Sequence, residues 1–87
     1  MGTTTQSTKL NVVARAPFEI YFEGQALSVS ATNKVGRFDI LPGHADLFSL
    51  INPGEVVIET ENEDISINAT NGIVCVRADE VMLFLNI

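Results

Sequence analysis

The chain has 87 residues, a mass of 9.4 kDa, one cysteine and a formal net charge of −6. This length supports a single domain, and a hydrophobic content of 46% is too high for a disordered chain. A single cysteine excludes an internal disulfide framework. The longest apolar run, 81–85, is far shorter than the roughly 18 residues of a membrane span.

The charge is unevenly distributed along the chain. Residues 1–44 carry four cations and three carboxylates, whereas residues 45–87 carry eight carboxylates and one cation, Arg77. A protein that binds nucleic acid needs many cations to displace the counterions of the phosphates, and an anionic membrane surface repels an acidic chain. We therefore expect neither nucleic acid binding nor direct membrane insertion.

β-Branched residues dominate the apolar content, since valine and isoleucine together number 17 against seven leucines. These residues favour strands over helices. From Lys9 onward, short apolar–polar alternations are separated by turn residues such as Pro42-Gly43. The alternation predicts strands at 10–14, 18–23, 27–31, 38–41, 55–61, 65–70, 73–76 and 81–85. Eight to ten strands at this spacing predict an antiparallel sandwich or barrel.

Two of the expected connections carry hairpin signals. The polar segment 62–64 predicts the tip of one hairpin, and Asn71-Gly72 is the strongest two-residue type I′ signal in the chain. The only plausible helical turn, at 45–50, is too short to change the fold class.

Five carboxylates lie within ten residues of the second half, with no cation among them: Glu55, Glu59, Glu61, Glu63 and Asp64. The simplest interpretation is a solvated hairpin whose charge discourages edge-to-edge aggregation. Calcium binding is the alternative, although the glycine-punctuated spacing of an EF-hand loop is absent.

The run 81–85 has no polar face. It is either buried on both sides or presents an apolar surface to a partner, and the sequence leaves both interpretations open. Cys75 lies within another apolar run, 73–76, which favours a small buried side chain over a reactive nucleophile.

Residues suited to catalysis are scarce. His44 is the only histidine, so no cage of several histidines can bind a metal. His44 and Asp46 share a face if the strand continues through them, but a structural turn histidine is the simpler interpretation. The chain has no phosphate-binding glycine loop and no nucleophile elbow. We expect no catalytic residues, no metal site and no cofactor.

One segment carries a family motif: Gly36-Arg37-Phe38-Asp39-Ile40-Leu41-Pro42-Gly43-His44-Ala45. It resembles the Gly-Glu-x-Gly-Ile-Leu-Pro-Gly-His-Ala stretch in the N-terminal β-sandwich domain of the epsilon subunit of F-type ATP synthase, called delta in mitochondria. Tyr21-Phe22-Glu23-Gly24 and Asn52-Pro53-Gly54-Glu55-Val56 are similar to further motifs of that family. Order and spacing agree from about residue 9 to 86.

The resemblance implies a sandwich of about ten antiparallel strands at 9–87, preceded by a flexible polar tail at 1–8. It implies a non-catalytic rotor subunit of the central stalk, which links the gamma subunit to the c-ring and helps couple ion translocation to ATP synthesis. Its place would be a peripheral complex on the cytoplasmic side of the bacterial inner membrane, or the equivalent organelle compartment. A stand-alone β-sandwich module for protein–protein interaction is the alternative.

The resemblance also implies site residues. The c-ring contact is expected at Gly36, Arg37, Pro42, Gly43 and His44. The gamma contact is expected on the last strand, at Val81, Leu83 and Leu85.

The chain departs from the family pattern in several ways. Arg37 replaces the usual glutamate, which reverses a charge at the expected ring contact, and Asp46 replaces the usual proline. The C-terminal helical hairpin of many family members is absent from these 87 residues. We therefore expect neither ATP binding nor an inhibitory role.

Overall fold

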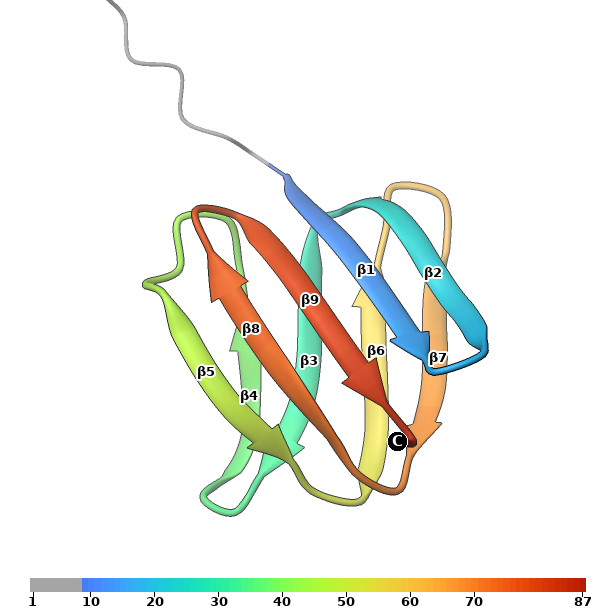
Figure 1. Cartoon of the computed structure of the whole chain (residues 1–87). Coiled ribbons are helices and arrows are strands. Elements are labelled where there is room, and N and C mark those ends of the chain that lie inside the picture. The colour runs from blue at the N-terminus through green and yellow to red at the C-terminus, as the bar shows by residue number, and fades with distance from the viewer. Residues whose placement is uncertain (1–8) are drawn as a thin grey trace, which may run out of the picture.

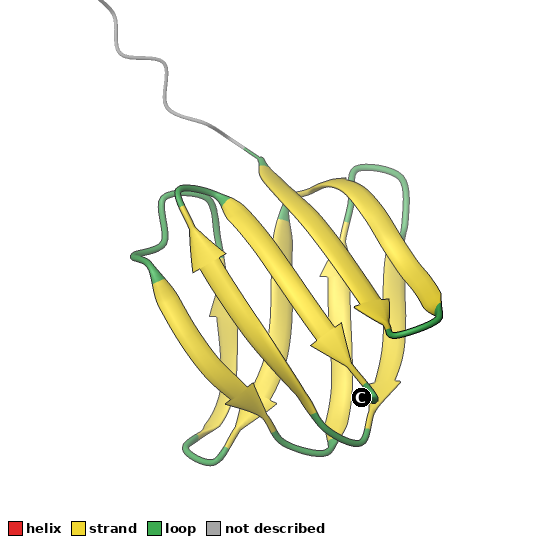
Figure 2. Cartoon of the chain, viewed as in Figure 1, coloured by secondary structure: helices red, strands yellow, loops and turns green. Residues whose placement is uncertain are grey.

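The computed structural model describes residues 9–87, which form nine strands and no helix (Figures 1 and 2). The strands are β1 (Leu10–Ala16), β2 (Glu19–Ala26), β3 (Ser28–Asn33), β4 (Gly36–Ile40), β5 (Leu47–Ile51), β6 (Gly54–Glu59), β7 (Asp64–Ala69), β8 (Gly72–Arg77) and β9 (Glu80–Leu85). The predicted all-β class is confirmed, with nine strands instead of about ten. The tail expected at 1–8 lies outside the described residues.

The strands form a sandwich of two sheets. The five-stranded sheet has the order β2-β1-β9-β8-β5, and the four-stranded sheet has the order β4-β3-β6-β7. All strand pairs are antiparallel except β1 and β9, which run parallel side by side in Figure 1. The expectation of a purely antiparallel sandwich is wrong at this pair. Local turn signals reveal only hairpin neighbours, and these two strands lie at opposite ends of the chain.

The core lies between the sheets and follows from the two-residue period of strands. In β1 the side chains of Leu10, Val12 and Ala14 point inward and are essentially inaccessible to solvent. Val29 and Ile58 approach them from the four-stranded sheet and are equally buried. The core contains no buried polar or charged residue among positions 9–87, so apolar burial stabilises the sandwich.

The connection through Asn71-Gly72 is not a hairpin. It carries the chain from β7 in one sheet to β8 in the other, and neither residue has the positive φ that a type I′ turn requires. Gly72 is needed for a different reason. A Cβ atom on Gly72 would lie 2.5 Å from the backbone oxygen of Phe84. The type I′ prediction is therefore wrong, and the glycine serves the close approach of β8 to β9.

The type I′ geometry occurs instead at the hairpin between β8 and β9. Its two central residues, Ala78 and Asp79, have φ values of 50° and 65°. Neither is glycine, so the sequence carries no Asn-Gly type of signal there. By contrast, the hairpin predicted at 62–64 is confirmed, because β6 and β7 pair across it.

The segment 45–50, where a helical turn was conceivable, mostly belongs to β5. This strand forms one edge of the five-stranded sheet and pairs with β8. It was missing from the strands expected on sequence grounds, because four of its five residues are apolar and hide the alternation.

Asn86 fastens the end of β9 to the other sheet. Its Oδ1 accepts hydrogen bonds from the backbone N and the Oγ1 of Thr70, at 2.8 and 3.0 Å. Its Nδ2 donates to the hydroxyl of Tyr21 at 3.1 Å and to the carbonyl of Asn68 at 3.2 Å. The side chain therefore links the end of β9 to β2 in the same sheet and to the end of β7 in the other sheet.

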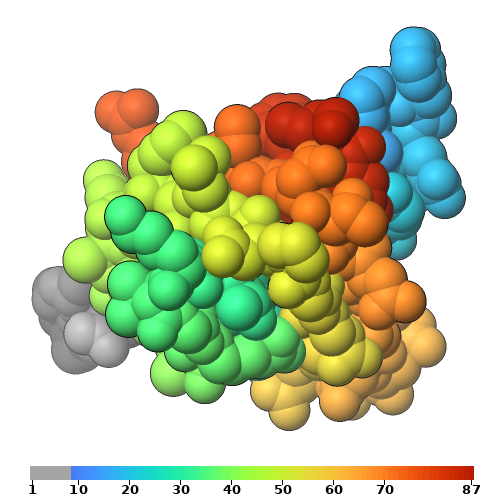
Figure 3. Space-filling view, turned by 90° about the horizontal axis from the view of Figure 1, so that it is seen from below, coloured from blue at the N-terminus to red at the C-terminus, as the bar shows by residue number. Residues whose placement is uncertain are grey.

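Seen from below, the connections between strands cover the lower end of the sandwich (Figure 3). The β1–β2 turn, in light blue, projects beyond the rest of the surface. Its Phe18 makes almost no contact with the domain, since its relative exposure is 102%. A single exposed aromatic residue does not by itself indicate a partner.

Candidate interaction surfaces

The outer face of the five-stranded sheet is apolar across three strands. Strand register places the outward-facing residues of β5, β8 and β9 in two rows. One row is Phe48, Cys75 and Met82, and the other is Leu50, Ile73 and Phe84. We call these six residues the apolar face. Phe48 and Leu50 are 69% and 64% exposed, and Met82 and Phe84 are 38% and 41% exposed.

The last strand supplies this surface with side chains other than those expected. Val81, Leu83 and Leu85 point into the core and are at most 2% exposed, so their side chains are not available to a partner in the folded domain. The residues between them, Met82 and Phe84, point outward. Of the two interpretations of the run 81–85, the structure supports the one in which one side is a surface.

Cys75 is exposed, which contradicts its predicted burial. The apolar run 73–76 lies in β8, where Val74 and Val76 point inward while Ile73 and Cys75 point outward. Cys75 sits between Phe48 and Met82 in its row. The thiol is therefore near the centre of the apolar face.

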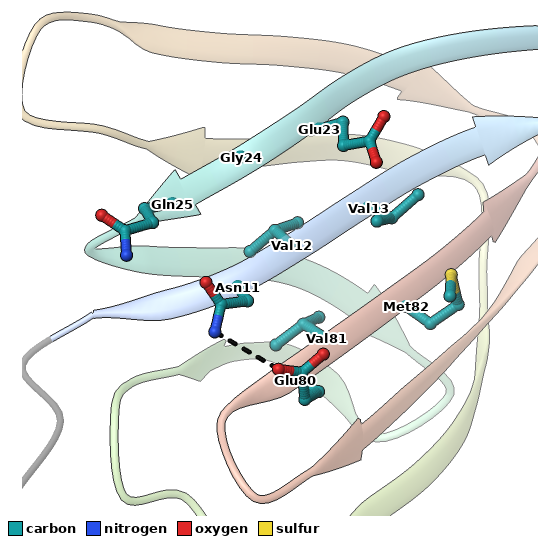
Figure 4. A pocket seen from close by; sticks show the side chains of 9 residues that line it. All are labelled: Asn11, Val12, Val13, Glu23, Gly24, Gln25, Glu80, Val81 and Met82. Atoms are coloured by element: carbon teal, nitrogen blue, oxygen red, sulfur yellow. Dashed lines mark hydrogen bonds between the residues drawn. The ribbon is translucent and has the colours of Figure 1, made fainter.

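Next to the apolar face, a shallow depression of about 280 Å³ opens across β2, β1 and β9 (Figure 4). Val13 and Met82 contribute its apolar part, while Glu23 and Glu80 contribute carboxylates. Asn11 donates from Nδ2 to Oε2 of Glu80 at 3.3 Å. The depression is open to solvent, so it does not provide the enclosed environment in which small-molecule ligands are usually bound.

The outer face of the four-stranded sheet is polar. Ser30 donates to Asp39 at 2.6 Å and Ser28 donates to Glu59 at 3.0 Å, while Ser66 donates to Glu55. These cross-strand hydrogen bonds are exposed and satisfy the carboxylates within the sheet. This face therefore has the character of a solvated surface, in contrast to the apolar face.

The acidic segment forms the hairpin between β6 and β7 and the strands beside it. Thr60 closes the turn by donating from Oγ1 to the carbonyl of Glu63 at 2.7 Å. Lys9, distant in sequence, forms an ion pair with Glu61. Across residues 9–87 no three acidic, histidine or cysteine side chains come together as a metal site. The hairpin interpretation of these carboxylates agrees with this arrangement.

The five residues expected at the c-ring contact lie at the two ends of β4. Gly36 and Arg37 begin the strand, and the Pro42-Gly43-His44 turn follows its end. Five residues of extended chain span about 17 Å, so the two groups do not form one loop. They lie instead along the strand at the free edge of the four-stranded sheet.

Arg37 lies over the outer face of the four-stranded sheet. Its Nη1 donates to the carbonyl of Glu55 on β6 and to Oγ1 of Thr32 on β3, the latter at 3.4 Å. The Arg37 side chain thus extends from β4 across β3 to β6. It is an exposed cation on a face that otherwise carries the carboxylates of Asp39, Glu55 and Glu59.

Pro42 and Gly43 form a tight turn with a defined geometry. The backbone N of His44 donates to the carbonyl of Leu41 at 3.0 Å, and Gly43 has a φ of 84°. Proline at the second position and a positive φ at the third are the features of a type II turn. The motif therefore encodes one specific backbone conformation.

His44 and Asp46 make separate contacts. The Nδ1 of His44 lies 2.7 Å from the carbonyl of Ala45, whereas Oδ1 of Asp46 accepts a hydrogen bond from the backbone N of Ala78 at 3.2 Å. Both residues lie in the connection between β4 and β5, not on one strand face. The structure therefore does not bring them together as an acid–base pair.

Comparisons with known proteins show which family this chain belongs to. The family model for the ATP synthase delta/epsilon chain β-sandwich domain matches residues 7–86, which is nearly the whole chain. The chain belongs to this family. The match thereby confirms the resemblance to the delta/epsilon family that was predicted from the Pro42-Gly43-His44 motif.

Two ATP synthase epsilon chains illustrate the similarity. The one from Vesicomyosocius okutanii is 41% identical over 66 residues, covering 76% of this chain and 48% of the relative. The one from Wolinella succinogenes is 41% identical over 63 residues, covering 72% of this chain and 47% of the relative. The chain thus spans about half the length of these epsilon chains.

Solved structures show the same fold. A chain in the Euglena gracilis mitochondrial ATP synthase structure, described as OSCP/F1/c-ring, superimposes with a TM-score of 0.86 and 15% identity, covering 97% of this chain and 54% of that one. A chain in the Tetrahymena thermophila mitochondrial ATP synthase central stalk and c-ring structure superimposes with a TM-score of 0.76 and 18% sequence identity. At these identities the likeness establishes the β-sandwich fold alone. Residues 9–87 contain no helix long and apolar enough to cross a membrane.

Proposed function

We propose that this delta/epsilon domain is a non-catalytic rotor component of an F-type ATP synthase, joining the gamma subunit to the c-ring. The observation that carries the proposal is the apolar face, in a chain whose family relatives are ATP synthase epsilon chains. The domain would help to couple ion translocation to ATP synthesis performed elsewhere in the complex. It would reside in the peripheral part of that complex, on the cytoplasmic side of a bacterial inner membrane or its organelle equivalent.

The apolar face is the proposed gamma contact. Its four exposed large hydrophobic members, Phe48, Leu50, Met82 and Phe84, gather on one side of the molecule, and contiguous apolar patches of this kind mark protein interfaces. Aromatic residues and methionine are enriched in such interfaces. The contact first expected at Val81, Leu83 and Leu85 is thus proposed for the outward-facing side chains of the same strand and its neighbours.

The edge along β4 is the proposed c-ring contact. Arg37 lies near the start of this strand, with its guanidinium over the adjoining outer face, and the Pro42-Gly43-His44 turn follows the other end, so the backbone of the five expected residues lies along one edge. Polar, charged contacts of this type set orientation and register more than raw affinity. The gamma and ring contacts would then use different sides of the sandwich, as a connecting subunit requires.

Mechanical transmission requires that the domain itself does not deform. The dry core and the Asn86 hydrogen bonds between the sheets supply that rigidity. No step of bond making or breaking is assigned to any residue. The domain's contribution is to keep two partners in fixed relative orientation while the stalk turns.

Co-expression with the gamma subunit and c-ring of the same organism tests the proposal. We expect the chain to co-purify with both, and the Arg37→Glu variant to keep gamma while losing ring association, since the substitution reverses the charge at the edge. Failure of the folded wild-type chain to bind either partner would contradict the rotor role and favour a stand-alone interaction module. Unchanged ring binding by Arg37→Glu would contradict the placement of the ring contact.

A further inference from the structure

The connection between β4 and β5, residues 41–46, is attached to the β8–β9 turn by two reciprocal hydrogen bonds. The backbone N of Gly43 donates to Oδ1 of Asp79 at 2.7 Å. In return, the backbone N of Ala78 donates to Oδ1 of Asp46 at 3.2 Å. Each segment thus supplies a carboxylate to an amide of the other, and both lie at the upper left of Figure 1.

Asp79 is itself held in place by the strands around it. Its backbone carbonyl accepts a hydrogen bond from the backbone N of Asn11 at 2.9 Å, and its neighbours Arg77 and Glu80 are paired across the hairpin. Asp79 has a φ of 65°, a conformation that aspartate tolerates better than most residues. The carboxylate that receives the Gly43 amide therefore projects from a fixed backbone position.

The Gly43 amide is the one that defines the turn type. Type I and type II turns differ mainly by a flip of the central peptide, here the bond between Pro42 and Gly43. The N–H of Gly43 belongs to that peptide, so a carboxylate bound to it favours one orientation over the other. Charge-assisted hydrogen bonds of this kind are stronger than neutral ones.

From these contacts we propose that Asp79 and Asp46 are positioning residues that hold the Pro42-Gly43-His44 turn in its type II form for docking to the c-ring. Asp79 orients the central peptide, and Asp46 keeps the loop against the β8–β9 turn. Neither carboxylate needs to touch the partner. The docking part of this inference rests on the ring contact proposed above, whereas the turn geometry does not.

Two variants remove the carboxylates while keeping the backbone conformation accessible. Asp79→Gly retains a residue that adopts positive φ at no steric cost, and Asp46→Ala removes the second acceptor. Glu63→Ala is the matched control, because it removes an exposed carboxylate from a hairpin held by Thr60 and by backbone atoms. Hydrogen exchange of the Gly43 amide, followed by NMR in the chain alone, reports the turn directly.

We expect the Gly43 amide to exchange about tenfold faster in Asp79→Gly, because the variant removes a hydrogen bond to a charged group that stabilises the turn. Binding to the isolated c-ring should weaken about tenfold in Asp79→Gly and less in Asp46→Ala, while binding to gamma stays unchanged. Unchanged Gly43 exchange would overturn the inference. An equal loss of ring and gamma binding would also overturn it, because it would indicate general destabilisation. If wild type binds no ring, the proposed function fails, while the exchange measurement still decides the role of Asp79 in the turn.

Discussion

Replacing Phe84 with aspartate should weaken binding to the gamma subunit at least about 30-fold, because buried aromatic residues of an interface often contribute more than 2 kcal/mol. Phe84 lies within the apolar face beside Ile73 on β8, with Arg15 on its other side in the strand register. A carboxylate there would lose its hydration when the partner covers this face. Binding of the purified chain to gamma, measured by titration calorimetry, checks this result.

The Phe84→Asp variant should still fold, because the side chain is already 41% exposed and Arg15 lies next to it in register. Phe18→Asp is the matched control, since Phe18 is fully exposed in the β1–β2 turn and is not one of the six residues of the apolar face. Its affinity for gamma should match that of wild type. Equal losses in the two variants would show that the effect is not specific to the apolar face.

Gly72→Ala should be the most destabilising of the substitutions considered for the folded domain. The added Cβ would lie 2.5 Å from the backbone oxygen of Phe84 and 2.8 Å from Cδ2 of Leu85. The backbone atom belongs to the paired strand β9 and cannot move without disturbing the sheet. Overpacking of this kind costs about 2–3 kcal/mol, so Tm should fall by roughly 10–20 °C in a domain of this size. Thermal unfolding followed by circular dichroism measures the shift.

The Asn71→Ala variant distinguishes the close approach of β8 to β9 from an effect on the turn conformation. Asn71 has no positive φ, and its side chain accepts one hydrogen bond, from the backbone N of Ile87 at 3.0 Å. Its replacement should cost only about 1 kcal/mol. A larger loss in Asn71→Ala than in Gly72→Ala would show that a type I′ hairpin, not a close strand approach, governs this connection.

The sequence predicted the fold class well because most strands keep a visible alternation. In β1 and β7, inward residues such as Val12 and Ile67 are apolar while outward neighbours such as Asn11 and Ser66 are polar. The two-residue period then reveals both the strand and its buried side. The family motif around Pro42 supplied the remaining evidence for a sandwich.

Three of the errors share one physical cause. The outer face of β5, β8 and β9 is apolar, so the apolar–polar alternation disappears along these strands. The sequence therefore predicts a buried Cys75, does not indicate β5, and favours the inward residue Leu83 over the outward Phe84. The parallel pairing of β1 with β9 has no local signal at all. A strand without a polar face in a small domain is thus itself an indication of a partner.

Reactivity of Cys75 tests the central claim most directly, because the single thiol of the chain lies within the proposed gamma contact. The rate of its alkylation by N-ethylmaleimide is measured for the chain alone, with the isolated c-ring, and with gamma. We predict rapid labelling alone and with the ring, which uses the β4 edge, and at least tenfold slower labelling in the gamma complex. An unchanged rate in a gamma complex verified by size exclusion would contradict docking through the apolar face.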